Sequence, residues 1–271
     1  MHNLLNSKTF LFTPAHKCQL FIKSIESGAD AIVFDLEDSC PPNFKKTVHS
    51  KLVKQENILK QNPFIYRIND LRTPFGLKDI LFIIESKLKP YAIIVPNVEN
   101  VDMIDTLRRL LKNIKLISTI ESPRGLQFAY KIALVSDALI FGSADYSSSF
   151  GVYLNFDNLA FPRNTISVAA AAANIPAIDT ACFKIHDKVH LEKECNFIRN
   201  IGFSGKAAIH PFQVETINRL LSPPQENIKW AKKIINSVEG VSNLNGDMVG
   251  PPFIKIAEKI LKKHKQQQGE K

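Results

Sequence analysis

Short apolar segments alternate with longer amphipathic segments along most of the chain. Eight of the apolar segments have the length and the β-branched or aromatic content of strands; they are residues 9–13, 31–36, 64–68, 91–95, 115–120, 137–142, 177–182 and 206–210. Helical patterns lie between them, for example at residues 16–28, 100–113 and 164–174. The strand segments are apolar throughout, which is typical of parallel strands that helices cover. The pattern therefore predicts an α/β fold, either a (β/α)₈ TIM barrel or an open doubly wound sheet.

Polar residues at the ends of the predicted strands favour the barrel. They are Asp35, Glu37, Asp38, Arg67, Asn97, Glu121, Asp145, Asp179 and His210. In an open sheet the ligand-binding groups concentrate at one switch point, whereas in a barrel every strand end faces a single mouth. The chain also lacks the GxGxxG and GxxxxGK[ST] phosphate loops of nucleotide-binding sheets.

The segment after the eighth strand is predicted to be a helical extension. We expect a TIM barrel over residues 1–221 and an extension over residues 222–271, which packs beside or over the barrel mouth as a lid. The last part, residues 251–271, has six Lys against two Glu. This basic tail is typical of a solvated helix end, because blocks of like charge usually stay in water.

Composition narrows the class of protein. Of the 271 residues 45% are hydrophobic and 23% are charged, as in ordinary globular proteins. No apolar run reaches the roughly 18 residues of a membrane span, so no membrane partner is expected. The four cysteines show no CxxC and no zinc spacing, and His16, His186 and His190 show no metal spacing with carboxylates. A cytoplasmic protein with reduced thiols is therefore expected.

The net charge of +9, from 35 Lys and Arg against 26 Asp and Glu, raises the possibility of a polyanionic partner. Lysine-rich segments such as Lys45–Lys46 and Lys232–Lys233 have no interleaved aromatic residues. We therefore expect no nucleic-acid partner. Polyanion binding through the basic surface is the weakest of the functional readings.

Four carboxylates follow three of the predicted strands. Glu37 and Asp38 follow the second strand, Glu121 the fifth and Asp145 the sixth. Carboxylates gathered at one mouth repel one another unless a cation neutralises them. Mg²⁺ binds one or two protein carboxylates together with water and substrate oxygens. The pattern predicts Mg²⁺ as cofactor, with Glu121 and Asp145 as its direct ligands; ordinary surface acids at strand ends are the alternative.

Arg67 ends an otherwise apolar strand, so it must point into the mouth or be buried against a partner. Its planar fork suits a carboxylate, and Glu37 on the neighbouring strand is expected to hold it. An Arg–Glu pair that only closes the barrel is the alternative. Asp35 could face either the core or the outer helices, and the pattern assigns it no catalytic role. His210 is a lone histidine, more often a structural hydrogen bonder than a base.

The motifs of the chain resemble, in order and spacing, the citrate lyase β-subunit-like (CitE-like) group of the HpcH/HpaI aldolase/citrate lyase family. They are LFTPAHK (11–17), SGADAIVFDLEDSCPPNFK (27–45), YRIND (66–70), IIVPNVEN (93–100), ISTIESPRGL (117–126), LIFGSADYSSSFG (139–151), IPAIDT (175–180) and GFSGKAAIHPFQV (202–214). The resemblance runs from about residue 9 to residue 261.

The resemblance implies a (β/α)₈ barrel, a homotrimer and Mg²⁺. It also implies cleavage or formation of a C–C bond between an acyl thioester and a 2-oxo acid. Within it, Glu121 and Asp145 match the metal ligands, and Glu37 and Asp38 match acids beside the metal's water shell and the arginine. Arg67 matches the arginine that binds the oxo-acid oxygens.

The resemblance extends to further substrate-binding positions, and it has gaps. The loop beside the pantetheine arm of the thioester is matched by Ile209, His210 and Pro211. Lys17 stands where the family has an arginine, so it keeps the charge but loses the planar fork. Asn97 replaces a lysine after the fourth strand. Gly250 occupies the place of an acidic lid residue that acts as acid or base from a neighbouring subunit in CoA-dependent members.

Two functions follow as expectations. The first is a Mg²⁺-dependent C–C lyase that cleaves a β-hydroxyacyl thioester such as citryl-, citramalyl- or malyl-CoA, with CoA or an acyl-carrier protein as the carrier. General acid–base catalysis typically contributes about 10²–10⁴ in rate. The loss of the lid acid at Gly250 therefore motivates the second, a protein that binds metal and a small acid as a regulatory or binding subunit with altered or lost lyase activity.

Overall fold

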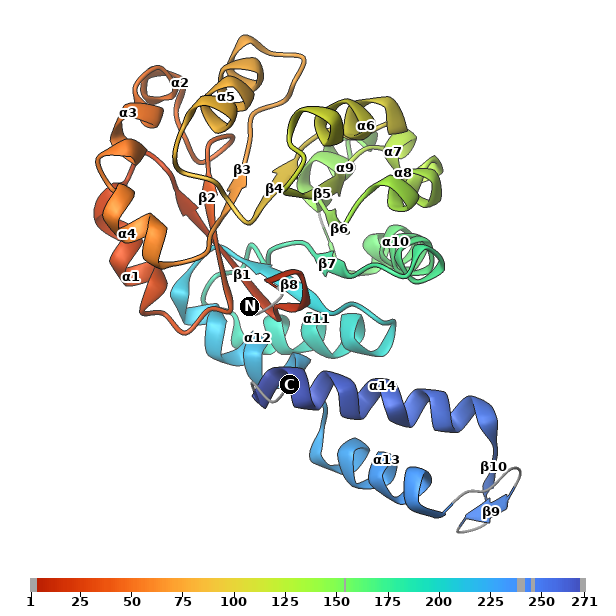
Figure 1. Cartoon of the computed structure of the whole chain (residues 1–271). Coiled ribbons are helices and arrows are strands. Elements are labelled where there is room, and N and C mark those ends of the chain that lie inside the picture. The colour runs from red at the N-terminus through yellow and green to blue at the C-terminus, as the bar shows by residue number, and fades with distance from the viewer. Residues whose placement is uncertain (1–3, 154, 238–241, 245–246, 269–271) are drawn as a thin grey trace. The chain divides into compact units, whose positions relative to one another are not determined.

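Eight parallel strands close into a barrel in sequence order, as the computed structural model of the chain shows (Figure 1). The structure describes all residues except 1–3, 154, 238–241, 245–246 and 269–271. The strands are β1 (Thr9–Pro14), β2 (Ala31–Asp35), β3 (Ile65–Arg67), β4 (Ala92–Val95), β5 (Lys115–Ile120), β6 (Ala138–Phe141), β7 (Ala177–Asp179) and β8 (Gly205–Ala208). Because β1 pairs with both β2 and β8, the barrel is confirmed and the open sheet is excluded.

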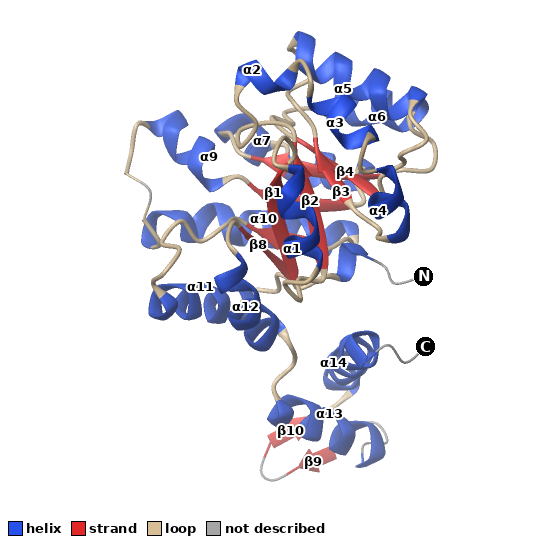
Figure 2. Ribbon diagram, turned by 90° about the vertical axis from the view of Figure 1, so that its left-hand side faces the viewer, coloured by secondary structure: helices blue, strands red, loops and turns tan. Residues whose placement is uncertain are grey.

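Helices follow the strands and surround the barrel (Figures 1 and 2). They are α1 (Phe21–Ile25), α2 (Pro42–Lys45), α3 (Val48–Val53), α4 (Glu56–Gln61), α5 (Pro74–Glu85), α6 (Val101–Leu110), α7 (Pro123–Gln127), α8 (Ala129–Val135), α9 (Ser143–Phe150), α10 (Ala160–Ala173), α11 (Lys188–Asn200) and α12 (Val214–Leu221). Side-chain caps start several of them: Asn100 accepts a hydrogen bond from the Met103 amide at the start of α6. In the described part of the chain, we find no helix with the length and apolar composition needed to cross a membrane.

The strand register decides which side chains enter the barrel. Val33 of β2 pairs with Ile65 of β3, and both belong to the buried cluster inside the barrel. Two residues further on, Asp35 pairs with Arg67. Because side chains two positions apart point to the same face of a strand, Asp35 and Arg67 also point inward, one layer nearer the mouth.

The barrel interior is apolar below this polar layer. The cluster is closed at the end opposite the mouth by Leu4 and Leu5 of a short 3₁₀ helix, Leu4–Asn6. Its other members are Phe10, Ala31, Val33, Ile65, Ala92, Ile94, Ile117, Ala138, Ile140 and Ile178. Burying each of its Val, Leu, Ile or Phe side chains contributes about 1.5–3 kcal/mol. The lower barrel is therefore a rigid base beneath the polar mouth.

The chain divides into two compact units, one that ends at Asn218 and one that begins at Arg219. The second unit contains α13 (Gln225–Ser237), the antiparallel pair β9 (Ser242–Leu244) and β10 (Asp247–Val249), and α14 (Pro251–Gln268). In chain order the β-pair lies between its two helices. Ala231, Ile234, Val249 and Ala257 form a small core of its own. A lid function of this unit stays a prediction.

Candidate active site

A cavity of about 380 Å³ lies at the mouth of the barrel. Its walls come from the carboxyl ends of several strands and the segments that follow them. The lining residues that bear on its chemistry are Phe12, Asp35, Asp38, Arg67, Thr119, Glu121, Gly142, Ser143, Asp145, Thr180 and Ile209. In TIM-barrel enzymes the reaction takes place at this face of the barrel. The cavity is therefore the candidate active site.

Arg67 contributes a positively charged guanidinium to the wall of this cavity. Its Nε and Nη2 each donate to a carboxylate oxygen of Asp35 at 2.6 Å. Its Nη1 lies 3.2 Å from Glu37 Oε2 and 3.1 Å from Asp38 Oδ2. The guanidinium also lies over the Phe12 ring, 5.3 Å from its centroid. The expected contact with Glu37 is present, but the bidentate hold comes from Asp35, the residue to which the sequence pattern assigned no role.

Asp35 is an anchor that fixes Arg67. It is almost fully buried, and its carboxylate also accepts from the backbone amides of Glu37 and Ser39, both at 3.0 Å. Burial opposes its ionisation, but the charge and hydrogen bonds of Arg67 and the hydrogen bonds from Ser39 hold its pKa below the ordinary value. An ionised carboxylate with four donors locks the guanidinium in one orientation. Arg67 is therefore preorganised toward the cavity.

Glu121 is held in place by two features of the neighbouring loops. Its Oε1 accepts a 2.6 Å hydrogen bond from the backbone amide of Asn97. Asn97 has a φ of +53°, a left-handed conformation that Asn adopts more readily than most residues. On the other side, a Cβ added at Gly142 would lie 2.5 Å from Glu121 Cβ and closer still to the carboxylate. Glu121 therefore fits only because residue 142 has no side chain.

The carboxylates at the mouth destabilise one another's charged forms. Burial raises the pKa of Glu37 to about 9, with repulsion from Asp38 and Glu121 adding to it. Burial, with repulsion from Asp145, raises the pKa of Glu121 to about 7. The pKa of Asp145 is also raised, by burial and by Asp38. The mouth therefore gathers more carboxyl groups than the Arg67 guanidinium can neutralise, and without a further cation some of them keep a proton near neutral pH.

This arrangement fits a divalent cation. Glu121 and Asp145 both line the cavity and offer the hard oxygen ligands that Mg²⁺ prefers. A bound cation would offset the burial and repulsion that oppose their ionisation. In addition, the Thr119 hydroxyl lines the same cavity and is buried without a hydrogen-bond partner among the described residues. The site thus combines the fixed guanidinium of Arg67, two carboxyl groups that could bind a metal ion, and the Thr119 hydroxyl, which the described residues leave without a hydrogen-bond partner.

Of the other site residues predicted from the sequence, one lines the cavity and the rest lie outside the lining found among the described residues. Ile209 lines the cavity, while His210 and Pro211 are exposed and do not belong to the lining found among the described residues. Lys17 is likewise exposed and outside that lining. Their roles in substrate binding stay predictions.

The proposed lid position Gly250 belongs to the second unit, where its carbonyl accepts from the amides of Phe253 and Ile254 at the start of α14. The side chain of its neighbour Asp247 lies outside the described residues. The role of Gly250 therefore rests on the resemblance alone.

Sequence reasoning missed Asp35, Thr119 and Gly142. Asp35 lies two residues after Val33, so it points into the barrel as Val33 does. The sequence does not show this direction, because β2 is apolar on both faces and has no visible alternation. Thr119 is the only hydroxyl-bearing residue of β5 that lines the cavity, and nothing in its local pattern distinguishes it from Ser118. Gly142 follows a strand directly, a position where close backbone or side-chain approach often requires glycine.

Comparisons with known proteins identify relatives of this chain by sequence and by fold. The family model of the HpcH/HpaI aldolase/citrate lyase family matches residues 8–211. Citrate lyase subunit beta of Leuconostoc mesenteroides subsp. cremoris is 29% identical over 97% of this chain and 94% of its own. The crystal structure of RipC from Yersinia pestis is 34% identical and has a TM-score of 0.74 over 83% of this chain and all of its own.

A third relative shows the same fold at lower identity. CitE from Mycobacterium tuberculosis, in complex with magnesium, acetoacetate and coenzyme A, has a TM-score of 0.80 and 24% identity over 95% of this chain and 97% of its own. The family match covers the whole barrel, including every strand that lines the cavity. The chain belongs to the HpcH/HpaI aldolase/citrate lyase family.

Proposed function

We propose that this protein is a Mg²⁺-dependent carbon–carbon lyase that cleaves a β-hydroxyacyl thioester to an acyl thioester and a 2-oxo acid. The observation that carries the proposal is the convergence of Arg67, Glu121 and Asp145 on one cavity. Family membership supports this reaction class. The Leuconostoc relative is by name a subunit of citrate lyase, and the Mycobacterium CitE structure holds magnesium, acetoacetate and coenzyme A. Citryl, citramalyl and malyl thioesters are the candidate substrates.

In this proposal Glu121 and Asp145 hold the metal. When bound, Mg²⁺ supplies a Lewis acid beside the oxygens on which charge develops as the C–C bond breaks. Asp35 keeps the Arg67 guanidinium fixed, so that the protein need not reorganise when the 2-oxo acid forms. The Asp38 side chain, which is 67% exposed, is the partner of Arg67 that a substrate carboxylate can displace most easily.

Two neighbouring groups complete the proposed binding site. Glu37 contacts the same guanidinium nitrogen as Asp38 but is only 14% exposed, so it keeps Arg67 in place after Asp38 has moved. The Thr119 hydroxyl is free to donate to a substrate oxygen deep in the cavity. Ile209 gives the cavity an apolar edge where the thioester arm would pass.

The direct test is release of a 2-oxo acid. Purified protein with Mg²⁺ is mixed with citryl, citramalyl and malyl thioesters, carried either on CoA or on an acyl-carrier protein. The 2-oxo acid is measured through NADH consumption by a coupled dehydrogenase. Glu121→Ala and Arg67→Ala should abolish the release, whereas Asp137→Asn, outside the cavity, should retain it. Absence of release from every thioester would refute the lyase proposal.

A second candidate is a metal- and small-acid-binding subunit without lyase activity, motivated by Gly250. Gly250→Asp distinguishes the two, because the family's acid would be restored at that position. A gain of activity by a factor on the order of 10² or more would indicate an enzyme that lost its lid acid. If the thioesters and 2-oxo acids bind but both Gly250→Asp and the unchanged protein are inactive, the binding subunit is favoured.

We further propose that the chain acts as a homotrimer in the cytoplasm. The trimer follows from the family resemblance, since a lid residue from a neighbouring subunit requires an assembly. The cytoplasm follows from the cysteines: Cys18, Cys40, Cys182 and Cys195 are all free thiols, as is usual in a reducing compartment. Light scattering of the purified protein would refute the trimer if it gave the mass of a monomer or a dimer.

A further inference from the structure

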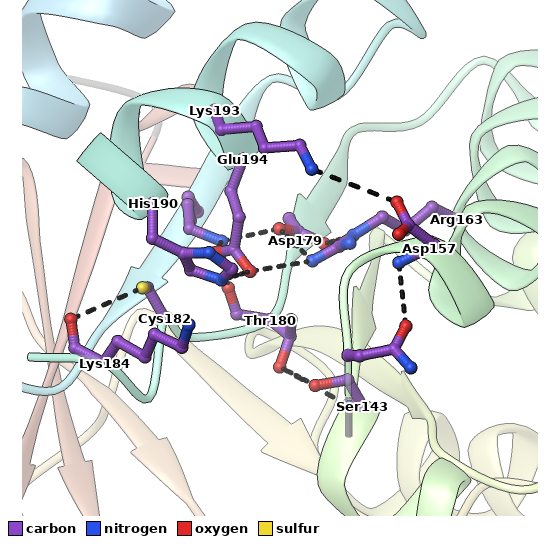
Figure 3. A network of polar contacts seen from close by, with 12 residues as sticks. Ser143, Asp157, Arg163, Asp179, Thr180, Cys182, Lys184, His190, Lys193 and Glu194 are labelled. Carbon is purple, nitrogen blue, oxygen red and sulfur yellow. Dashed lines mark hydrogen bonds and ion pairs between the residues drawn. The ribbon is translucent and has the colours of Figure 1, made fainter. Parts of the chain in front are cut away.

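A second group of metal-binding side chains lies apart from the barrel mouth, between β7 and α11. Cys182 lies just after β7, and His190 and Glu194 lie on α11 (Figure 3). One ligand atom from each of the three lies within 4.8 Å of the others. No sequence spacing among the cysteines and His190 predicts this group. The fold brings a loop thiol to an imidazole and a carboxylate that are four residues apart on one helix.

The spacing of His190 and Glu194 suits a metal ion. Residues four apart on a helix lie on the same face, one turn from each other. His190 Nε2 lies 3.5 Å from Glu194 Oε1. Two ligands bound about 2.0–2.1 Å from a tetrahedral Zn²⁺ are roughly 3.3 Å apart, so this pair needs little movement to chelate one. Cys182 Sγ, which now donates to the Lys184 carbonyl at 3.7 Å, adds a soft third ligand.

Glu194 is held in an orientation that leaves one of its oxygens toward the histidine. Its Oε2 lies 2.9 Å from Lys206 Nζ, and its Oε1 lies 3.5 Å from His190 Nε2 and 3.6 Å from Arg163 Nη2. Lys206 is fixed in turn by Asp179, at 2.7 Å. Partners behind a ligand that hold it in place are typical of metal sites. Here a buried ion-pair network serves that purpose (Figure 3).

The charge around the group can accept a cation. Arg163 and Lys206 are balanced by Asp179 and Glu194, so this network is neutral as a whole. When a divalent ion binds and Cys182 loses its proton to solvent, the site gains a single net positive charge. Such a thiolate also distinguishes this site from the hard oxygen site at the barrel mouth, because sulfur ligands favour Zn²⁺ over Mg²⁺.

A second cavity gives access to the group. It has a volume of about 360 Å³, and both His190 and Glu194 line it. Its wall also includes Tyr153, Asn155 and Lys184. It shares Ser143, Thr180, Ala181 and Phe183 with the cavity at the mouth, so the two cavities adjoin along these residues. An ion can reach the ligands through this cavity, and its fourth position would face water or an anionic ligand there.

We propose that Cys182, His190 and Glu194 form a second metal site, which binds a divalent transition-metal ion of the Zn²⁺ type. Binding joins the loop after β7 to α11 and exchanges the thiol proton of Cys182 for a sulfur–metal bond. The site is separate from the proposed Mg²⁺ site, so either one can exist without the other.

The proposal is tested with Co²⁺, whose bond to a thiolate gives an absorption band in the near ultraviolet. The protein is titrated with Co²⁺ in excess Mg²⁺, which occupies the hard ligands at the mouth. We expect a thiolate band that saturates at one Co²⁺ per chain and that Zn²⁺ abolishes. Cys182→Ser should lose the band, and His190→Gln should weaken Co²⁺ affinity by at least about tenfold, as even loss of a supporting residue does in other sites.

Matched variants identify the ligand. Cys195→Ser removes a buried thiol next to Glu194 on the same helix, and Cys18→Ser removes a partly exposed one; both should retain the band. Glu121→Gln should retain it too, since that residue belongs to the mouth. If the unchanged protein gives no thiolate band, or if the band persists undiminished in Cys182→Ser, the site does not exist. Circular dichroism checks the fold of each variant, and His190→Gln, which changes a partly exposed side chain, provides a second test.

Discussion

At the residue scale, the candidate active site depends on groups that position its charged side chains. Arg67 owes its orientation to Asp35, and Glu121 owes its place to the Asn97 amide and to the missing side chain at Gly142. Each of these contacts can be removed by one substitution. A substitution that keeps the charges at the mouth but removes one of these contacts should therefore still impair the site.

Arg67→Lys keeps the positive charge but removes the planar fork that binds both oxygens of Asp35. We expect the rate of thioester cleavage to fall by about 10²–10³, the effect typical of losing one preorganised donor group. Steady-state kinetics with the best thioester measures it. Arg72→Lys is the control, because Arg72 binds Asp70 in a similar way but is 58% exposed and outside the cavity lining. An equal loss in both variants would contradict the assigned role of Arg67.

Gly142→Ala adds a methyl group in the space of the Glu121 side chain. Glu121 must move, so we expect Mg²⁺ affinity to fall by about tenfold or more, the order seen when metal ligands lose their support. Isothermal titration calorimetry gives the affinity. Gly28→Ala serves as the control: its φ of +78° makes alanine strained, but no atom lies within 4 Å of the added group. It should lose stability and keep its Mg²⁺ affinity. Unchanged Mg²⁺ binding in Gly142→Ala would argue against Glu121 as a ligand.

At the scale of elements, β7, β8, α10 and α11 are joined by a buried charge network. Lys206 of β8 donates to Asp179 at 2.7 Å and to the Thr180 carbonyl at 2.8 Å, and Arg163 of α10 donates to the same Asp179 at 2.8 Å. Both cationic side chains are fully buried. Such networks contribute little net stability when complete, but removing one member leaves an uncompensated buried charge.

Lys206→Met should therefore destabilise the fold by about 3–5 kcal/mol, because Asp179 and Glu194 then share only Arg163. Urea unfolding followed by circular dichroism gives the free energy of unfolding. Lys115→Met is the matched control: Lys115 also pairs with an aspartate, Asp137, but is 50% exposed. Its loss should change stability by less than about 1 kcal/mol. Similar values for the two variants would show that burial does not govern this network.

At the scale of the whole molecule, Mg²⁺ binding should be linked to folding. The proposed ligands Glu121 and Asp145 follow β5 and β6, so they meet only when these two strands pair in the folded protein. An ion that binds only the folded chain stabilises it by RT ln(1 + c/Kd) at ion concentration c, so the free energy of unfolding rises with the logarithm of that concentration. The stabilisation by Mg²⁺ is expected to be large because, without a cation, the folded protein must bury these carboxyl groups close to one another.

We expect Mg²⁺ at 100 times its dissociation constant to raise the free energy of unfolding by about 2.7 kcal/mol and to raise the melting temperature. Chelation with EDTA should reverse the shift. Asp145→Asn should remove it, while Asp137→Asn, an acid held by Arg108 and Lys115 away from the mouth, should preserve it. Differential scanning calorimetry measures all three proteins. A shift of equal size in Asp145→Asn would exclude Asp145 as a ligand.

The sequence by itself determined the number and order of the eight barrel strands, because each is a short apolar segment between amphipathic helices; it did not predict the pair β9 and β10 of the extension. It also placed Arg67, Glu121 and Asp145 at strand ends, where the barrel collects them. Tertiary structure alone decided the direction of Asp35, since β2 is apolar on both faces and shows no alternation. It alone brought Cys182 to His190 and Glu194, because a loop and a helix meet only through the packing of α11 beside β7 and β8. Local periodicity reports which face of a segment is buried; contacts between distant segments depend on register and packing, which no single segment encodes.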